Sequence, residues 1–211
     1  TPVRALVLQG MIAAGLIVPG SKLTLHEVNT NVTRSRMLSV VERWRASVSV
    51  AREQCRDDDE REPYGDIEVE YGALAPAKVD VDSVWIPQLI DEIPVIAMLA
   101  AFAGGSLRIR GAAELRVKES DRIETLEREL RKMGVKISTA PDGFDVTGGG
   151  PLAPARFDSH GDHCAVSRLE AVRPSFRRAI RAVPEDIHRH GDCSSRLHDL
   201  AALAEFSKNG G

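Results

Sequence analysis

The chain has 211 residues, of which 43% are hydrophobic and 28% are charged, a composition typical of a globular protein with a core of its own. The formal net charge of -3 excludes the overall positive field that nucleic-acid-binding domains use. The longest apolar stretch, LIDEIPVIAMLAAFAGG (89–105), is interrupted by Asp91, Glu92 and Pro94, so it predicts no membrane span.

The cysteines and the first residues bear on where the protein works. Cys55, Cys164 and Cys193 are an odd number without the spacing of a zinc site, which favours a reducing cytoplasm over a disulfide framework. The chain begins TPVRALVLQGM, with neither an initiator Met nor the layout of a signal peptide. We therefore expect a cytoplasmic protein, present here as a processed product or a fragment.

The first half of the chain predicts a strand, a helix and two further strands. SKLTLHEV (21–28) follows a helix that ends in Gly, and it alternates apolar and polar residues as a half-buried strand does. TRSRMLSVVERWRA (33–46) has the apolar spacing of a helix. SVSVARE (47–53) and DIEVEYG (66–72) predict short strands on either side of a charged, solvated loop. The helix should bury Met37, Leu38, Val41 and Trp44.

The second half repeats the same order. The stretch 85–105 predicts an irregular start and then a helix from about Pro94, which suits a first turn, to a stop at two glycines. SLRIRGA (106–112) predicts a strand, and SDRIETLERELRKMG (120–134) predicts an amphipathic helix. VKISTAPDGFDVTGG (135–149) predicts a hairpin with its turn at PDG. The apolar face of the last helix consists of Ile123, Leu126, Leu130 and Met133.

This order constitutes an internal repeat. Strand, loop, helix, strand and strand follow one another over 21–72 and again over 106–148, roughly 85 residues apart. Each unit leaves one helix face and one sheet face to bury. We therefore predict an α+β (mixed α/β) protein in which several units share a core, with the helices inside and the sheets outside.

The most charged segment of the second unit is RVKESDR (116–122), in which five of seven residues are charged. If the helix opens at Ser120 or a neighbour, its first-turn N–H groups and dipole favour an anion there. Lys118 and Arg122 then form a pocket for a carboxylate or phosphate, and Glu119 is a carboxyl group placed to give or take a proton. The alternative interpretation is a capped helix with salt-bridged surface charges.

Longer motifs around this segment resemble the second half of the 5-enolpyruvylshikimate-3-phosphate synthase family. RVKESDRI, preceded by LIDEIPVIAMLAAFAGGSLRIRGAAEL, carries the resemblance, and GLIVPGSKLTLHEVNTN (15–31) and DSHGDH (158–163) match in the same order. The resemblance implies repeated βαβαββ-type units that form an inside-out α/β barrel domain with buried helices. It predicts an enolpyruvyl transferase-like domain over residues 1–163 and a divergent, partly helical tail over residues 164–211.

The resemblance also assigns roles to single residues. Asp91 matches an aspartate beside the 5-hydroxyl of shikimate-3-phosphate, and Lys118 matches a lysine that contacts the same substrate and balances charge. Glu119 matches the glutamate that protonates the methylene carbon of phosphoenolpyruvate. Arg122 matches an arginine on the carboxylate or phosphate of phosphoenolpyruvate. We expect the Asp91 carboxyl group to lie within reach of the pocket formed by Lys118, Glu119 and Arg122.

The implied reaction is the step of the shikimate pathway, towards aromatic amino acids, that transfers an enolpyruvyl group from phosphoenolpyruvate to the 5-hydroxyl of shikimate-3-phosphate. The hydroxyl adds to C2 while C3 takes a proton, and loss of phosphate then restores the double bond. The expected partners are these two small molecules, without metal, cofactor, nucleic acid or membrane. Asp162 and His163, in DSHGDH, are assigned by the resemblance to substrate binding.

The chain departs from the family pattern in two places. The cationic residues and serines of the family's first domain have no counterpart, and Cys164 stands where an arginine that binds phosphoenolpyruvate is expected. The tail after it is rich in Arg, His, Cys and Ser, which is typical of GC-rich DNA read in the wrong frame. We hypothesise a frameshift or rearrangement near residue 163, which sequencing of the source gene tests. A non-catalytic anion-binding domain of the same fold is the alternative function.

The tail offers two further interpretations. Its histidines and cysteine follow no standard zinc spacing, so we expect polar loops and no metal. Its arginines lack interleaved aromatic residues, so we expect a solvated helix and not a nucleic-acid surface. The first group comprises His188, His190, Cys193 and His198, with His160 and His163 just before the tail, and the second comprises Arg173, Arg177, Arg178 and Arg181.

Overall fold

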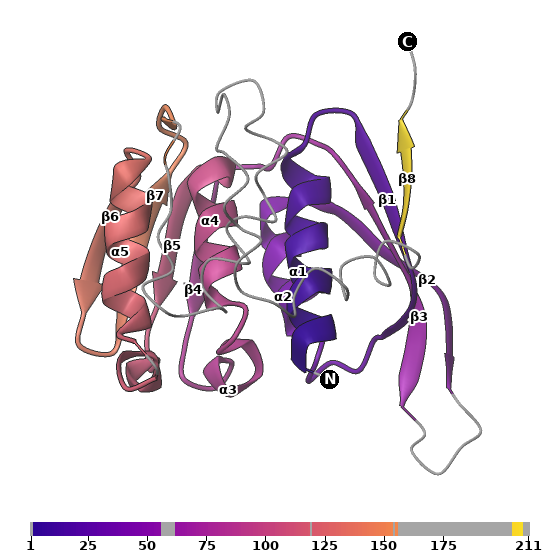
Figure 1. The fold of residues 1–211 in the computed structure, drawn as a ribbon, viewed down its shortest axis with the longest axis horizontal. Helices are drawn as coiled ribbons and strands as arrows, with labels where there is room; N and C mark the ends of the chain where they lie inside the picture. The colour runs from indigo at the N-terminus through magenta and orange to yellow at the C-terminus, as the bar shows by residue number, and fades with distance from the viewer. Residues whose placement is uncertain (1, 56–61, 119, 154, 156–203, 209–211) are drawn as a thin grey trace, which may run out of the picture.

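The computed structural model describes residues 2–55, 62–118, 120–153, 155 and 204–208 (Figure 1). Helices and strands alternate along the chain as the sequence predicts. The helices are α1 (Pro2–Ile17), α2 (Arg36–Val41), α3 (Ile86–Leu89), α4 (Ile93–Ala103) and α5 (Arg122–Lys132), with 3-10 turns η1 (Glu42–Trp44) and η2 (Ala113–Arg116). The strands are β1 (Ser21–Asn29), β2 (Ser47–Cys55), β3 (Pro63–Glu70), β4 (Ala77–Val81), β5 (Gly105–Ile109), β6 (Lys136–Ala140), β7 (Gly143–Gly148) and β8 (Ala204–Lys208).

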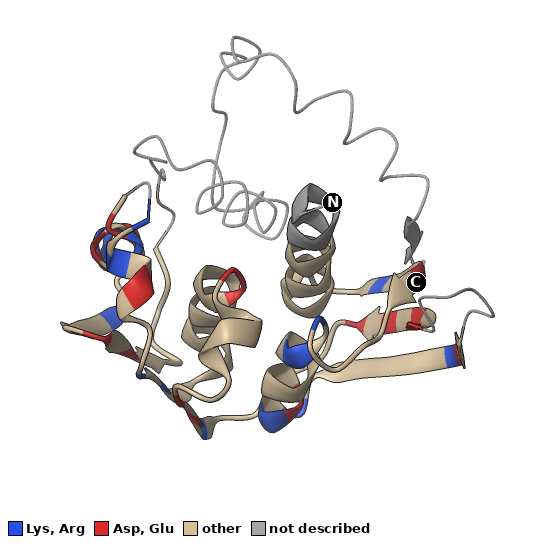
Figure 2. Ribbon diagram, turned by 90° about the horizontal axis from the view of Figure 1, so that it is seen from below, with Lys and Arg blue, Asp and Glu red and all other residues tan. Residues whose placement is uncertain are grey.

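The described strands form two four-stranded sheets. Their orders are β2-β3-β1-β8 and β4-β5-β7-β6. Seen end-on, the two sheets form one curved outer layer, and the helices lie on its inner side (Figure 2). A single apolar cluster runs through both halves and joins the helices to the inner faces of the sheets. The predicted arrangement, with helices inside and sheets outside, is therefore confirmed.

The internal repeat is confirmed by strand pairing. β1 pairs with β3 and β3 with β2, and in the second unit β5 pairs with β7 and β7 with β6, always antiparallel. The units differ at the fourth position. β4 runs parallel to β5, with Ala77 opposite Gly105, whereas β8 runs antiparallel to β1, with Ser21 opposite Lys208. The described part of the tail thus contributes a strand to the first sheet.

Strand β4 is an element that the sequence analysis missed. Its residues AKVDV alternate, with Val79 and Val81 buried and Lys78 and Asp80 exposed, which is the period of a half-buried strand. Parallel strands need a crossover connection, and the chain from β4 to β5 supplies it through α3 and α4. This crossover places the start of α4 near one end of the sheet.

Helix α4 lies at the centre of the core. Ten of its eleven residues are buried, and Figure 2 shows it almost without charge along its length. It packs against α1, α2, β5 and β7. The contact with β7 is close, because a Cβ added to Gly148 would lie 1.9 Å from the carbonyl oxygen of Ala100. Only glycine allows the helix and strand to approach in this way.

Helix α5 buries the face that the sequence predicts. Ile123, Leu126, Leu130 and Met133 are at most 5% exposed. The predicted helix over 33–46 is shorter than expected: α2 ends at Val41, η1 continues to Trp44, and Arg45 then adopts a left-handed φ of 52°. Its predicted apolar face is nevertheless buried.

A polar contact joins the first repeat unit to the segment before the second, outside the apolar core. The guanidinium carbons of Arg36 and Arg43 lie 4.9 and 4.8 Å from the centroid of the Trp85 ring. The Nε of Arg36 also donates a 2.7 Å hydrogen bond to Oε1 of Gln88. Guanidinium groups at these distances from an indole ring are attracted to it. α2 and η1 are thereby held against the start of α3.

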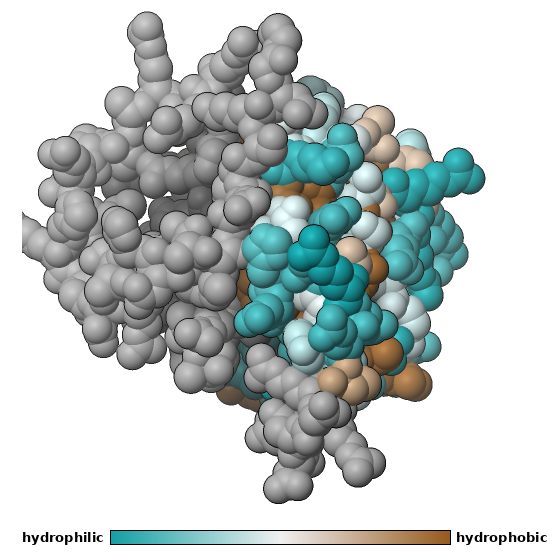
Figure 3. All heavy atoms as spheres, turned by 90° about the vertical axis from the view of Figure 1, so that its right-hand side faces the viewer, coloured by the Kyte–Doolittle hydropathy of each residue, from teal (hydrophilic) through white to brown (hydrophobic). Residues whose placement is uncertain are grey.

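The outer side of the first sheet carries a second polar cluster, on a face that is largely hydrophilic (Figure 3). β1 and β2 both contain irregularities opposite β3, where Glu27 and Arg52 have a φ of 52°. Asp66 of β3 lies between them. Its Oδ1 accepts a 3.2 Å hydrogen bond from the Glu27 N–H, and its Oδ2 lies 3.2 Å from His26 Nδ1 and 3.5 Å from Arg52 Nη1.

These contacts set the ionisation of Asp66. Burial opposes the charged form, but the hydrogen bonds from Glu27 N–H and His26 and the charges of His26 and Arg52 outweigh it, so the pKa of Asp66 is lowered below 3.8. A carboxyl group whose pKa is lower in the folded state stabilises the fold above its unfolded pKa. That contribution is lost as the pH falls through the folded pKa.

We predict that Asp66→Asn lowers the free energy of unfolding by about 1–3 kcal/mol at pH 7, because His26 and Arg52 lose a charged partner. The difference from wild type should shrink as the pH falls below about 3.8. Urea unfolding at pH 7, 5 and 3 measures it. The control is Asp80→Asn, which removes an exposed pair with Lys78. A difference that is the same at all three pH values contradicts the account.

We also predict that Leu130→Ala destabilises the protein by about 2–5 kcal/mol, because it opens a cavity where α5 meets the core. Leu130 is 0% exposed. Glu124→Gln on the same helix, at an exposed side chain, should change the free energy of unfolding by less than about 0.5 kcal/mol. Equal effects of the two substitutions in urea unfolding would show that α5 does not bury this face.

Candidate functional site

The starts of two helices converge at the predicted site. Asp91 lies two residues before the first residue of α4, and Arg122 is the first residue of α5. Nη1 of Arg122 lies 3.3 Å from Oδ1 of Asp91 and donates a hydrogen bond to it. The predicted proximity of Asp91 to the charged segment is therefore confirmed for Arg122.

The two partners differ in exposure. The side chain of Arg122 is 6% exposed and that of Asp91 is 53% exposed. A buried guanidinium group is costly unless anionic or polar acceptors surround it. Asp91 supplies such an acceptor from the solvent side. An incoming anion that is to bind Arg122 must therefore compete with, or join, the Asp91 carboxylate.

Lys118 interacts electrostatically with both Arg122 and Asp91. Its Nζ is 2.7 Å from Oε1 of Glu114, and this hydrogen bond is the main cause that raises the pKa of Lys118. The negative charge of Asp91 raises the pKa further and the positive charge of Arg122 lowers it. Lys118 is thus a protonated cation close enough to both to interact with them. Glu114 was not predicted, although its i,i+4 spacing to Lys118 was a signal for this pair.

The N-terminus of α5 is capped by Asp121 and not by Ser120. Oδ1 of Asp121 accepts a 2.9 Å hydrogen bond from the Glu124 N–H. Its Oδ2 lies 2.7 Å from Nη1 of Arg116. The capped helix with salt-bridged charges is therefore present, and the pocket for a carboxylate or phosphate between Lys118 and Arg122 stays a prediction.

A contact from α1 reaches the same end of α4. Nε2 of Gln9 donates a hydrogen bond to Oε1 of Glu92, the residue next to Asp91. Gln9 is 6% exposed, so the contact is shielded from solvent. It ties the first helix of the chain to the turn that carries Asp91, and the sequence analysis did not foresee it.

Several predicted residues lie outside the described ranges. These are Glu119, Asp162, His163 and Cys164, together with the histidines, arginines and Cys193 of the tail. The role of Glu119 in proton transfer therefore stays a prediction. Among the residues that the structure describes, no cluster of three or more His, Cys, Asp or Glu could hold a metal ion. No helix in the described ranges combines the length and the apolar character needed to cross a membrane.

A sequence model of the family described as EPSP synthase (3-phosphoshikimate 1-carboxyvinyltransferase) matches residues 10–169. The chain belongs to the EPSP synthase family. It is 40% identical over 193 residues to the 3-phosphoshikimate 1-carboxyvinyltransferase of Parasynechococcus marenigrum (strain WH8102), covering 92% of the chain and 40% of that protein. It is 45% identical over 153 residues to that of Bacillus velezensis, covering 72% of the chain and 35% of that protein.

Solved structures show the same fold. An EPSP synthase from Acinetobacter baumannii matches with a TM-score of 0.72 at 23% identity, covering 96% of the chain and 46% of that protein. The enolpyruvyl transferase NikO from Streptomyces tendae matches with a TM-score of 0.58 at 16% identity, covering 98% and 44%. The predicted enolpyruvyl transferase-like fold class is confirmed.

The lengths of these alignments show how much of its relatives the chain covers and how far the similarity continues along it. This EPSP synthase family member spans less than half the length of the relatives it matches. The Parasynechococcus alignment covers 193 residues, which is more than the 163 residues that precede Cys164. Similarity therefore runs into the tail, and a frameshift near residue 163 stays a prediction.

We predict that Asp121→Ala lowers the free energy of unfolding by about 1 kcal/mol, because the Glu124 N–H loses its acceptor. Asp121→Asn is the matched variant, since asparagine caps helices as well as aspartate does but cannot form the ion pair with Arg116. It should cost less than half as much. Urea unfolding and amide exchange at Glu124 report both. An alanine variant as stable as wild type would mean that the cap contributes nothing.

Proposed function

We propose that this chain forms the second-domain half of an enolpyruvyl transferase site. In the complete enzyme it would help to transfer the enolpyruvyl group of phosphoenolpyruvate to the 5-hydroxyl of shikimate-3-phosphate. The observation that carries the proposal is the convergence of Arg122 and Asp91 at the starts of α5 and α4, with Lys118 in their field. Relatives named 3-phosphoshikimate 1-carboxyvinyltransferase support the choice of substrates.

Each residue has a distinct role in this proposal. Arg122 grips the carboxylate or phosphate of phosphoenolpyruvate, since a guanidinium fork matches the geometry of either group. Lys118 balances the charge of the second anion. Asp91, the exposed acceptor of the set, hydrogen-bonds the attacking hydroxyl group. Glu119 delivers a proton to C3 while the hydroxyl adds to C2.

The cations do more than attract the substrates. Two anions repel each other, so holding them at attack distance requires positive charge fixed before they arrive. Cations already in position also stabilise the charge that develops on the phosphate as it leaves. Arg122 meets this requirement because the start of α5 and the Asp91 carboxylate hold it in place.

The site of such a protein is incomplete in this chain alone. The chain spans 40% of the Parasynechococcus relative, and the family's first-domain cations and the arginine expected at position 164 have no counterpart in its sequence. We therefore propose that turnover also requires the residues of the family's first domain. Loss of one well-placed donor typically slows an enzyme about a hundredfold or more, so loss of several should leave little turnover.

A non-catalytic domain of the same fold is the second candidate. Cys164 at the position of an expected arginine favours it. Adding a first-domain fragment of a relative distinguishes the two candidate functions. Turnover then appears only if this chain carries a competent half of the catalytic site. We place either protein in the cytoplasm with small anions as partners and with neither nucleic acid nor membrane. The odd number of cysteines without zinc spacing and the net charge of -3 support this placement.

We predict that the isolated chain binds phosphoenolpyruvate weakly at the start of α5 and shows negligible transferase activity. Isothermal titration measures the binding, and phosphate release in the presence of shikimate-3-phosphate measures activity. Arg122→Ala should abolish binding, because it removes the main cation. Glu119→Gln should leave binding almost unchanged, because its role is proton transfer.

The control is Arg108→Gln, which removes an arginine paired with Asp145 on an exposed part of β5 and β7 and should keep full binding. Two results would overturn the proposal. One is phosphoenolpyruvate binding that survives Arg122→Ala. The other is turnover by the unpartnered chain in the range of about 1–1,000 per second that ordinary enzymes reach.

A further inference from the structure

Arg116 donates hydrogen bonds to three acceptors within the protein, close to the residues assigned to substrate. It is the last residue of η2, two positions before Lys118. Its Nε donates to the carbonyl oxygen of Pro141 at 2.9 Å, and its Nη2 donates to that of Ala140 at 2.6 Å. Its Nη1 donates to Oδ2 of Asp121 at 2.7 Å. All three guanidinium nitrogens are thus engaged within the protein.

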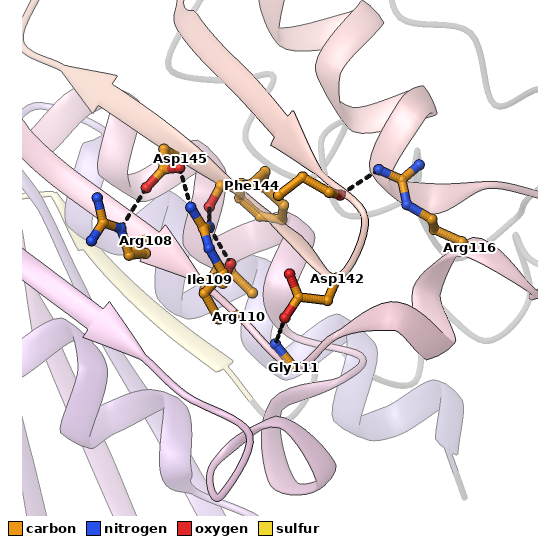
Figure 4. Close-up of polar contacts among 9 residues, drawn as sticks. Arg108, Ile109, Arg110, Gly111, Arg116, Asp142, Phe144 and Asp145 are labelled. Carbon is orange, nitrogen blue, oxygen red and sulfur yellow. Dashed lines mark hydrogen bonds and ion pairs between the residues drawn. The ribbon is translucent and has the colours of Figure 1, made fainter.

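The carbonyl groups belong to the turn between β6 and β7, where Ala140 pairs with Gly143. The same turn holds the chain at a second point. Oδ2 of Asp142 accepts a 2.9 Å hydrogen bond from the Gly111 N–H, and the Asp142 carbonyl accepts one of 2.7 Å from the Ala112 N–H. Figure 4 shows Asp142 and the Arg116 contact on this one turn. The turn therefore fixes the start of the segment 111–121 directly and its end through Arg116.

The third contact connects the sheet to the anion site. Asp121 uses one carboxylate oxygen to cap α5 and the other to bind Arg116. The next residue is Arg122. A guanidinium group presents its donors in a rigid plane, so three acceptors in fixed directions define its position, which the point charge of a lysine cannot do. Arg116 thereby fixes where α5 begins relative to the sheet.

We propose that Arg116 is a positioning residue for the anion site. It holds the N-terminus of α5 at the distance from the β6–β7 turn at which Arg122 meets Asp91, and it spans the segment that carries Lys118. This inference rests on the proposed function, because it names the residue that holds the binding residues of that site in position. Sites need supporting side chains that lock the binding residues in place, and a shift of about 1 Å can cost a hundredfold in rate.

The test compares Arg116→Gln and Arg116→Lys with wild type, with Arg108→Gln as control. Arg108 belongs to the same sheet, and its described partner, Asp145, lies outside the segment 111–121. Titration calorimetry with phosphoenolpyruvate gives the dissociation constant. We expect both Arg116 variants to bind on the order of tenfold more weakly and the control to bind as wild type. Lysine that retains full affinity would show that only charge matters, and glutamine that does so would show that Arg116 has no role; either result overturns the proposal.

Amide exchange at Glu124 and Thr125 separates this inference from the proposed function. If wild type binds no phosphoenolpyruvate, the proposed function fails, and exchange at these two amides still decides whether Arg116 positions α5. Exchange should be about tenfold faster in both Arg116 variants and unchanged in Arg108→Gln. Any fall in the urea midpoint, from loss of the partly exposed pair with Asp121 and of the two carbonyl contacts, should be too small to account for this faster exchange. Unchanged exchange, or faster exchange that merely follows a lowered midpoint, overturns the positioning role.

Discussion

An α-helix that is apolar on every side has no face for water, so it is stable only when other elements surround it. α4 is such a helix, and the fold follows from that constraint. α1, α2, β5 and β7 all contact it, which requires helices on the inside and sheets on the outside (Figure 1). The polar residues of this stretch can then lie only at the end of the helix. Asp91 and Glu92 are placed there, where α4 meets the charged segment.

The site brings together groups that disfavour one another locally. The N-terminus of a helix carries a partial positive charge, yet the first residue of α5 is Arg122, and its side chain is buried. Asp121 at the cap and Asp91 from the turn before α4 offset this positive charge. Residues that are unfavourable for local stability, such as an arginine at a helix N-terminus, are typical of functional sites. An anionic substrate would find there a cation that the fold holds in place.

Periodicity in the sequence predicted the elements better than the contacts between them. The 3.6-residue spacing of Ile123, Leu126 and Leu130 was enough to predict the buried face of α5. The alternation of β4 follows the same logic but covers only five residues, and this strand was not predicted. Contacts such as Gln9 with Glu92 could not be predicted, because they depend on how α1 packs against α4. The proximity of Asp91 and Arg122 required a family resemblance, since no spacing rule links residues on different helices.

Strand β8, at the edge of the first sheet, has a consequence for the way the chain folds. β4 joins its neighbour β5 through one local crossover, so the second sheet can form from a short stretch of chain. β8 joins β1 from the opposite end of the sequence, and closing so long a loop costs more conformational entropy before any contact forms. Pairings of high sequence separation slow folding. During synthesis β4 and β5 can pair early, whereas the edge of β1 stays open until residues 204–208 emerge.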